Sequence, residues 1–198
     1  MSWRYVRSVV NQDIELAVCR PGCNAFLVQH FHQETQIRFV LTGWRQFLVG
    51  GYHINVPAGS ACVLPAGIPH QGIDCAPDTV SLNLYVPADH SIALMSMTRP
   101  LAELFLDMPS STGTASIACV AAQAGLSREG FTRRFSRQHG MPPHAYRRML
   151  RLNKARQMLR TGTPPAEVAA ATDFADQSHF GRWFRHAFGT TPSRYQLA

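Results

Sequence analysis

The sequence predicts a two-domain α+β protein, in which an antiparallel β-barrel of the jelly-roll kind precedes an all-α domain. Short runs rich in β-branched and aromatic residues fill the first ninety residues, and Gly, Pro or Asn separates most of them. After Pro87 the pattern changes, and Met, Leu and Ala recur at helical spacing. The second half also contains an internal repeat, which indicates two copies of one helical unit.

The expected strands are 14–19, 25–31, 36–42, 45–49, 52–56, 60–64 and 79–86. A helix is expected over 100–108, and the Ser-, Thr- and Gly-rich stretch 109–116 is typical of a domain boundary. We therefore expect a β-barrel domain over 1–90, a short helical linker over 91–114 and a helical domain over 115–198.

The repeat aligns without a gap when the chain is shifted by 49 residues. The matched pairs are Phe131 and Phe180, Arg133 and Arg182, Phe135 and Phe184, Gly140 and Gly189, Pro143 and Pro192, and Tyr146 and Tyr195. Such self-similarity predicts two structural units of the same kind rather than a chance likeness of composition.

Each copy has the pattern of a helix-turn-helix motif. A short Ala-rich helix comes first, over 117–124 in one copy and 166–172 in the other. After a tight turn, Ser127 or Asp176 can cap the next helix. That helix has Phe residues four apart, which form one apolar face, and Gly140 or Gly189 ends it.

A helix over about 142–159 is expected between the two copies, with Pro142 and Pro143 suited to its start and Gly162 to its end. Eighteen helical residues span about 27 Å. Such a rigid spacer could hold two recognition helices roughly one DNA turn, about 34 Å, apart on one side of a duplex.

The charge of the chain is concentrated in its second half. Residues 1–100 carry six Arg and six acidic residues, whereas residues 101–198 carry thirteen Lys plus Arg against six acidic residues. This asymmetry indicates a polyanionic partner for the helical half, and nucleic acid is the first candidate. The sequence predicts no signal peptide and no membrane-spanning helix, and five Cys at irregular spacing favour a reducing, cytoplasmic setting.

The segment from Ile117 to Tyr195 resembles the DNA-binding domain of the AraC/XylS family of bacterial transcription regulators. The resemblance rests on Arg151-Leu152 followed by Ala155 and Leu159, on the run 174–184, and on Gly189-Thr-Thr-Pro192-Ser-Arg-Tyr195. It covers about 80 of the 198 residues. One departure is Asp173, where the family usually has Gly.

In this family the exposed faces of both recognition helices contact bases. Arg can pair bidentately with guanine and Gln can read adenine, so the residue types also suit the major groove. The expected DNA-binding residues are Arg128, Glu129, Thr132, Arg133, Arg137, Gln177, Ser178, His179, Arg182 and Arg185. Glu129 and Gly181 are unusual at contact positions of this family.

In the first half, a strand through His30 and His32 would place both imidazoles on one face, because alternate residues share a side. Gln36 and Arg38 continue that face if the strand runs on regularly. These residues, with Gly43 and a later Gly-Pro-Gly-His set ending at His70, resemble the two motifs of the cupin family of small β-barrels. The resemblance implies that His30, His32, Gln36 and His70 converge inside the barrel.

Two interpretations of this cluster stay open beside a purely structural one. Three imidazoles suit a divalent metal at His30, His32 and His70, although Gln36 stands where metal-binding cupins usually have Glu, and Glu34 could substitute for it. Alternatively His30, His32, Gln36, Arg38 and His70 line a pocket for a small-molecule effector, with Arg38 available for a carboxylate or for sugar hydroxyls.

The sequence therefore predicts a transcription regulator that binds double-stranded DNA and is controlled by a small molecule or metal in its N-terminal barrel. No catalytic residues are expected. The resemblance implies RNA polymerase and a second copy of the chain as further partners, and no membrane. The alternatives are a metal-dependent cupin enzyme with a DNA-binding appendage and an architectural DNA-binding protein without an effector.

Overall fold

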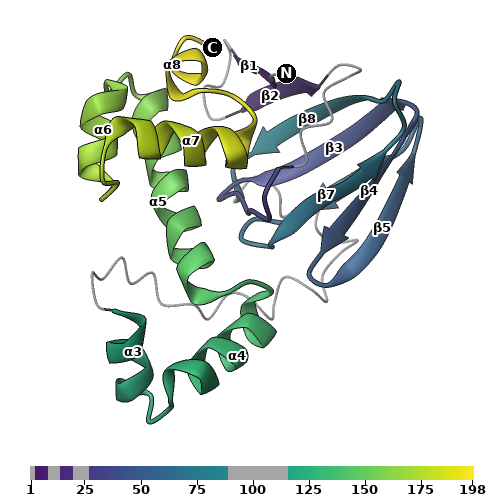
Figure 1. Cartoon of the computed structure of the whole chain (residues 1–198). Coiled ribbons are helices and arrows are strands. Elements are labelled where there is room, and N and C mark those ends of the chain that lie inside the picture. Colours follow the sequence, from purple (N-terminus) through teal and green to yellow (C-terminus); the bar gives the residue numbers. More distant parts are fainter. Residues whose placement is uncertain (1–2, 9–13, 20–26, 89–115) are drawn as a thin grey trace.

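The computed structural model describes residues 3–8, 14–19, 27–88 and 116–198 (Figure 1). The expected linker helix over 100–108 lies outside these residues. The described strands precede the described helices along the chain, so the α+β order of the two domains is confirmed. None of the described helices is both long enough and apolar enough to cross a membrane.

The N-terminal domain consists of two antiparallel sheets. The five-stranded sheet has the order β1 (Arg4–Arg7), β2 (Glu15–Cys19), β8 (Val80–Val86), β3 (Thr35–Thr42) and β6 (Ala61–Leu64). The three-stranded sheet has the order β5 (Tyr52–Pro57), β4 (Trp44–Val49) and β7 (His70–Cys75). In the described residues the two ladders stay separate rather than closing into one barrel, with a small apolar core around Phe47, Val49 and Leu64.

The expected strand over 25–31 is wrong in its described part. Residues 27–31 contain only an isolated bridge between His30 and His70. The strands β1 and β7 were not expected. β1 is four residues with two Arg, and β7 contains Gly72 and Asp74, so neither has the run of β-branched residues that marks a strand.

The helices of the second domain lie where the sequence repeat predicts them. Its helices are α3 (Ile117–Gln123), α4 (Arg128–His139), α5 (Pro143–Arg160), α6 (Pro165–Ala171), α7 (Gln177–Phe188) and α8 (Pro192–Gln196). Gly140 and Gly189 both adopt the left-handed conformation expected after α4 and α7.

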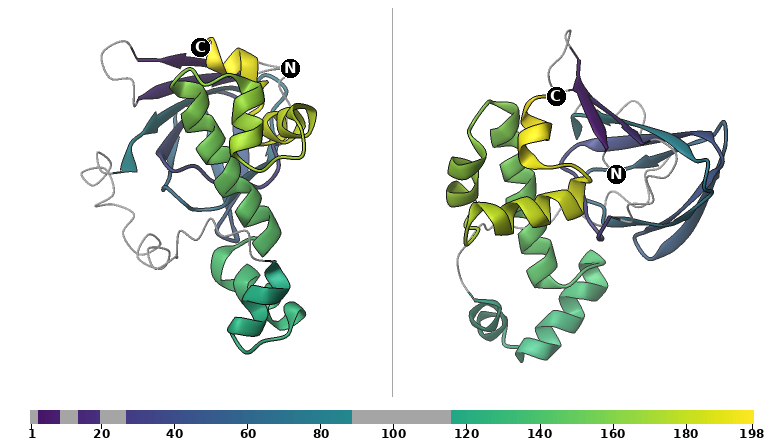
Figure 2. Two further views of the ribbon diagram at one scale, coloured as in Figure 1. Left: turned by 90° about the vertical axis from the view of Figure 1, so that its left-hand side faces the viewer. Right: turned by 45° about the horizontal axis from the view of Figure 1, so that its top comes forward.

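The two domains share one hydrophobic core. Trp3, Tyr5 and Tyr85 of the sheet domain belong to the same buried cluster as Phe184 and Tyr195 of the helical domain. In contrast, Phe131 and Phe135 of α4 are only half-buried. The second helix-turn-helix therefore packs against the sheets, whereas the α3–α4 pair projects away from them (Figure 2).

Candidate nucleic-acid interface and effector site

Both helix-turn-helix motifs have their recognition helix capped as the sequence predicts. The Ser127 side chain accepts a hydrogen bond from the Gly130 amide at the start of α4, and Asp176 accepts one from the His179 amide at the start of α7. Each cap fixes the first residue of its recognition helix, and the polar side chains of the first helical turn face solvent.

The turns before the two helices use one backbone conformation with different residues. Gly125 has a φ of +66°, and Asp173 has a φ of +56° at the matching position of the second copy. The side chain of Arg151 donates a hydrogen bond to the Asp173 carbonyl at 3.2 Å. The departure at Asp173 therefore changes the residue but keeps the turn.

The structure leaves most of the expected DNA-binding side chains accessible. The exposed ones are Arg128, Glu129, Arg133, Arg137, Gln177, Ser178, Arg182 and Arg185. Thr132 and His179 are half-buried and already engaged, because Thr132 donates to the Arg128 carbonyl and the Trp183 indole donates to Nε2 of His179 at 2.9 Å. These two are less available to a base.

A cationic depression of about 560 Å³ lies along α4, lined by Gly130, Arg133, Arg134, Arg137 and Gln138. Arg134 was not among the expected DNA-binding residues. It directly follows Arg133 in a helix that contains four Arg, which is a signal for it in the sequence. Three guanidinium groups around one depression suit the phosphates of a nucleic acid backbone.

The three histidines expected to converge do so, although not from one strand. His30 and His32 come from the loop before β3 and His70 from the start of β7, and a ligand atom from each lies within 4.8 Å of the others. Nδ1 of His30 contacts the Val28 carbonyl at 2.7 Å, and Nδ1 of His70 contacts the Ile68 carbonyl at 3.0 Å.

Burial keeps these imidazoles neutral. It lowers the pKa of His30 to about 4, against the opposing hydrogen bond to Val28, and Arg38 lowers it further. Burial and the neighbouring His30 hold the pKa values of His32 and His70 well below their ordinary range. All three rings are therefore uncharged at neutral pH.

Gln36 closes the cluster on the side of β3. Both Nε and Nη2 of Arg38 face one end of the Gln36 amide, at 3.3 and 2.9 Å, so that end is the oxygen. The amide nitrogen then donates to Nε2 of His32 and of His70, at 3.2 and 3.1 Å. The lone pairs that a metal would need from these two rings are thus already in use.

Cationic side chains surround the three histidines, and ligation of a divalent cation would have to overcome their repulsion. Arg38, Arg45 and Arg156 are close enough to lower the pKa of His30, and they would repel a metal ion in the same way. Glu34, considered as a substitute ligand, instead pairs with Arg156 and Arg160. The polar cluster is better suited to a neutral or anionic group.

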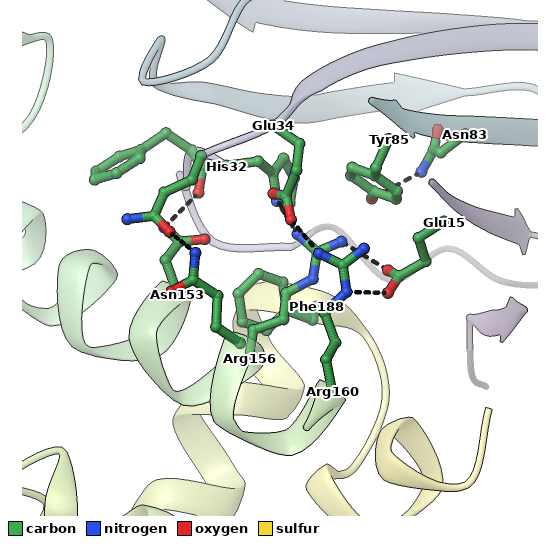
Figure 3. A network of polar contacts seen from close by, with 12 residues as sticks. Glu15, His32, Glu34, Asn83, Tyr85, Asn153, Arg156, Arg160 and Phe188 are labelled. Carbon is green, nitrogen blue, oxygen red and sulfur yellow. Dashed lines mark hydrogen bonds and ion pairs between the residues drawn. The ribbon is translucent and has the colours of Figure 1, made fainter. Parts of the chain in front are cut away.

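Sequence analysis missed a buried ion-pair cluster between the domains (Figure 3). Arg156 of α5 reaches Glu15 of β2 at 2.6 Å and Glu34 at 3.0 Å. Arg160 reaches Glu34 at 2.8 Å, and Tyr195 donates to Glu15. Arg156 and Glu15 are almost completely buried, and Nη1 of Arg156 also lies 3.3 Å from Nδ1 of His32.

The place of Arg156 in the sequence already indicates that it is buried. Leu152, Arg156 and Leu159 recur at spacings of four and three residues, so Arg156 lies on the apolar face of α5. A buried Arg is costly without an opposite charge, so its position pointed to a carboxylate partner from another element.

Two family models match the chain. Residues 24–114 match an AraC-like ligand binding domain, and residues 120–198 match a helix-turn-helix domain. The HTH-type transcriptional regulator MtrA of Neisseria gonorrhoeae is 35% identical over 79 residues, which are 39% of this chain and 26% of that protein. The probable transcriptional regulator LumQ of Photobacterium leiognathi is 35% identical over 83 residues, 41% of this chain and 34% of that protein.

These matches span only about a quarter to a third of the curated relatives. Over the whole chain, the solved structure of unsaturated fatty acid bound ToxT from Vibrio cholerae has a TM-score of 0.57 at 10% identity, covering 98% of this chain and 95% of that one. At this identity the likeness concerns the fold, and it confirms the two-domain arrangement.

MtrA is named as a transcriptional regulator and LumQ as a probable one, the class of protein that the sequence predicts here. One family model accounts for the sheet domain and the other for the helical domain, in the order that the sequence predicts. The chain therefore contains an AraC-like ligand binding domain followed by a helix-turn-helix domain, as the AraC/XylS resemblance of its sequence implies.

Proposed function

We propose that this protein is a sequence-specific DNA-binding transcription regulator whose N-terminal domain, about residues 1–90, senses a small molecule. The linker would span about 91–114 and the DNA-binding domain 115–198. The observation that carries the proposal is the pair of capped recognition helices, α4 and α7, whose exposed faces are polar and basic. They are joined by α5, whose 18 residues form a rigid spacer of about 27 Å.

The two recognition helices are proposed to read adjacent major-groove segments. In α4 the readers are Arg128, Glu129, Thr132, Arg133 and Arg137. In α7 they are Gln177, Ser178, His179, Arg182 and Arg185. Since Trp183 engages the His179 ring, we assign base reading in α7 chiefly to Gln177 and Arg182.

A small molecule in the N-terminal domain is proposed to control DNA occupancy. The polar cluster of His30, His32, Gln36, Arg38 and His70 is the effector site in this proposal. Its link to the DNA-binding domain is Arg156, which contacts His32 on one side and Glu15 on the other. A molecule that moves His32 would therefore disturb the docking of α5. The ToxT structures with a bound fatty acid show that a protein of this fold can take up a small organic acid.

DNase footprinting of the full chain on DNA selected from a random library tests the DNA-binding proposal. We expect two protected major-groove segments about one helical turn apart, and an affinity that falls steeply with salt. A single protected segment, unaffected by changes in α7, would contradict the proposal for the second motif.

The family resemblance further suggests a homodimer and a contact with RNA polymerase. Sedimentation of the full chain at micromolar concentration, with and without the selected DNA, tests the first. A monomer under both conditions would exclude a stable dimer. Transcription assays with purified RNA polymerase test the second, and unchanged transcription from a promoter that carries the selected site would oppose it.

A further inference from the structure

Two buried arginines in the sheet domain have no carboxylate partner among the described residues. Arg38 of β3 and Arg45 of β4 are each 3% exposed. No described Asp or Glu lies within ion-pair distance of either guanidinium. Two carboxylates of the sheet domain, Glu15 and Glu34, pair instead with Arg156 and Arg160 of α5. Among the described residues, carboxylates thus compensate one pair of arginines and leave the other pair without an ion-pair partner.

The two guanidinium groups lie against the same two aromatic rings. The Arg38 guanidinium carbon is 5.1 Å from the ring centroid of Trp3 and 4.7 Å from that of Phe47. For Arg45 the corresponding distances are 5.9 and 5.7 Å. The rings cover the faces of the groups, so the N–H donors at their edges are the part left for a ligand.

Some of these N–H donors already have a hydrogen-bond acceptor, and one buried donor has none in the described part of the chain. Arg38 uses Nε and Nη2 on the Gln36 amide oxygen. Nε of Arg45 is buried without a hydrogen-bond partner. Gly72 makes room for this side chain, because a Cβ there would lie 3.2 Å from Nη2 of Arg45.

Two like charges in one apolar interior are costly. Burial lowers the pKa of Arg38 to about 10, and the adjacent Arg45 adds to the shift by repulsion. An unpaired buried charge destabilises a folded protein far more than a paired one. A sequence that retains two such charges side by side is explained if an external anion compensates them.

We propose that Arg38 and Arg45 together bind the oxyanion of a small acid, carboxylate or phosphate, whose apolar body lies against Trp3 and Phe47. This assignment deepens the proposed effector site and rests on it. Arg45, which sequence analysis did not include, becomes the second anchor of the ligand. The neutral His32 and His70 complete a polar wall that adds no negative charge to oppose the anion.

Thermal unfolding and calorimetric titration of the full chain at constant chloride test this inference. The probes are benzoate, octanoate and inorganic phosphate, with benzamide and octanamide as neutral matches. We expect at least one anion to raise Tm and to bind, while the amides at equal concentration do not. Stabilisation by phosphate alone would identify a phosphorylated ligand, and stabilisation by a carboxylate alone would identify a carboxylic acid.

Variants separate this site from general charge effects. Arg38→Met and Arg45→Met should each weaken binding of the active anion roughly 10- to 100-fold. Arg45→Met should also raise Tm without ligand, since it removes an uncompensated buried charge. Arg4→Met, an exposed arginine on β1, is the matched control and should leave anion binding unchanged. If Arg45→Met fails to fold, Gly72→Ala keeps the charge, displaces the guanidinium and should still weaken binding.

The inference fails if the anions and the amides act alike, or if anion binding persists in both Arg→Met variants. In that case specific DNA binding by the unmodified chain would show that the proposed function still stands. If the unmodified chain binds the anion but no specific DNA sequence, the proposal of a transcription regulator is refuted and the anion site still stands.

Discussion

Asp173 shows at the scale of one residue how the second motif departs from the first. Its φ of +56° lies in the left-handed region, where a Cβ is normally unfavourable, while Gly125 occupies the matching turn at +66° without that cost. Asp tolerates the region better than most residues because its short polar side chain can bond locally. We therefore expect a rank order of stability at position 173 of Gly, then Asp, then Ala.

Replacing Asp173 tests this order. Asp173→Gly should raise the free energy of unfolding by up to about 1 kcal/mol, and Asp173→Ala should lower it by about 1 kcal/mol. The Arg151–Asp173 ion pair is long, 3.9 Å, and exposed, so its loss contributes little to either value. Urea denaturation measures both, with Gly125→Ala as the parallel change in the first motif. Equal stability of the Gly and Ala variants would show that the turn is unstrained.

The buried histidines give the protein a dependence on pH between 7 and 5. The pKa of His30 falls from 6.5 in the unfolded chain to about 4 in the folded protein, and those of His32 and His70 are also lowered. In this range the unfolded chain binds more protons than the folded one, so stability decreases as pH falls.

His30 alone should remove about 2 kcal/mol from the free energy of unfolding between pH 7 and pH 5. Glu34 does not contribute there, because Arg156 and Arg160 keep its pKa below 4.5 despite its burial. Urea denaturation at both pH values measures the change, and His30→Gln should reduce it. A loss of stability that is identical in His30→Gln would assign the pH dependence to other groups.

At the scale of elements, α4 and α7 are alike in their caps and different in their anchoring. Phe180, Phe184 and Phe188 are fully buried, whereas the Phe residues of α4 are half-buried. The recognition helix α4 is therefore packed less firmly than α7, and it carries the Arg-lined depression. We expect Arg134 of this depression to contact phosphate, and the better-fixed α7 to read bases more selectively than α4.

Arg133→Ala and Arg182→Ala should each weaken binding to the selected DNA by about 1–3 kcal/mol. Arg182→Ala should also relax base preference in one segment of the site, whereas Arg134→Ala should weaken all sequences alike and reduce the salt slope by about one. Fluorescence anisotropy at several salt concentrations measures these effects. Arg4→Ala removes the same charge from the sheet domain and should change neither quantity.

The elements also show what could be predicted from sequence. The repeat located every helix from α3 to α7, because caps, Phe spacing and terminal Gly are local features. His30 and His32 were placed on a strand that does not form, yet they meet His70, since the loop and β7 bring them together. Arg156 was missed because its partners, Glu15 and Glu34, are more than 120 residues away in sequence.

At the scale of the whole molecule, the two domains are held by a shared apolar core and by the ion pairs of Arg156 and Arg160. The Tyr5 hydroxyl donates to the Phe188 carbonyl, and Asn153 of α5 donates to the Phe31 carbonyl. These contacts attach the second motif and α5 directly to the sheet domain. The folded domains should therefore unfold as one cooperative unit.

Arg156→Met tests whether the ion-pair cluster maintains that unit. The change leaves Glu15 buried with a weaker set of partners, and breaking such a pair on one side costs about 3–5 kcal/mol. We expect the single calorimetric transition of the full chain to become two, with the sheet domain melting first because its buried Glu15 then keeps only Arg160 and Tyr195 as partners. Lys154→Met, an exposed change on the same helix, should keep one transition. Adding Glu15→Gln to Arg156→Met should recover part of the lost Tm, since it removes a buried charge that has lost its nearest cation. If Arg156→Met retains one transition at an unchanged Tm, the domains are joined by the apolar core alone, and α5 could not transmit a change at His32 through its ion pairs.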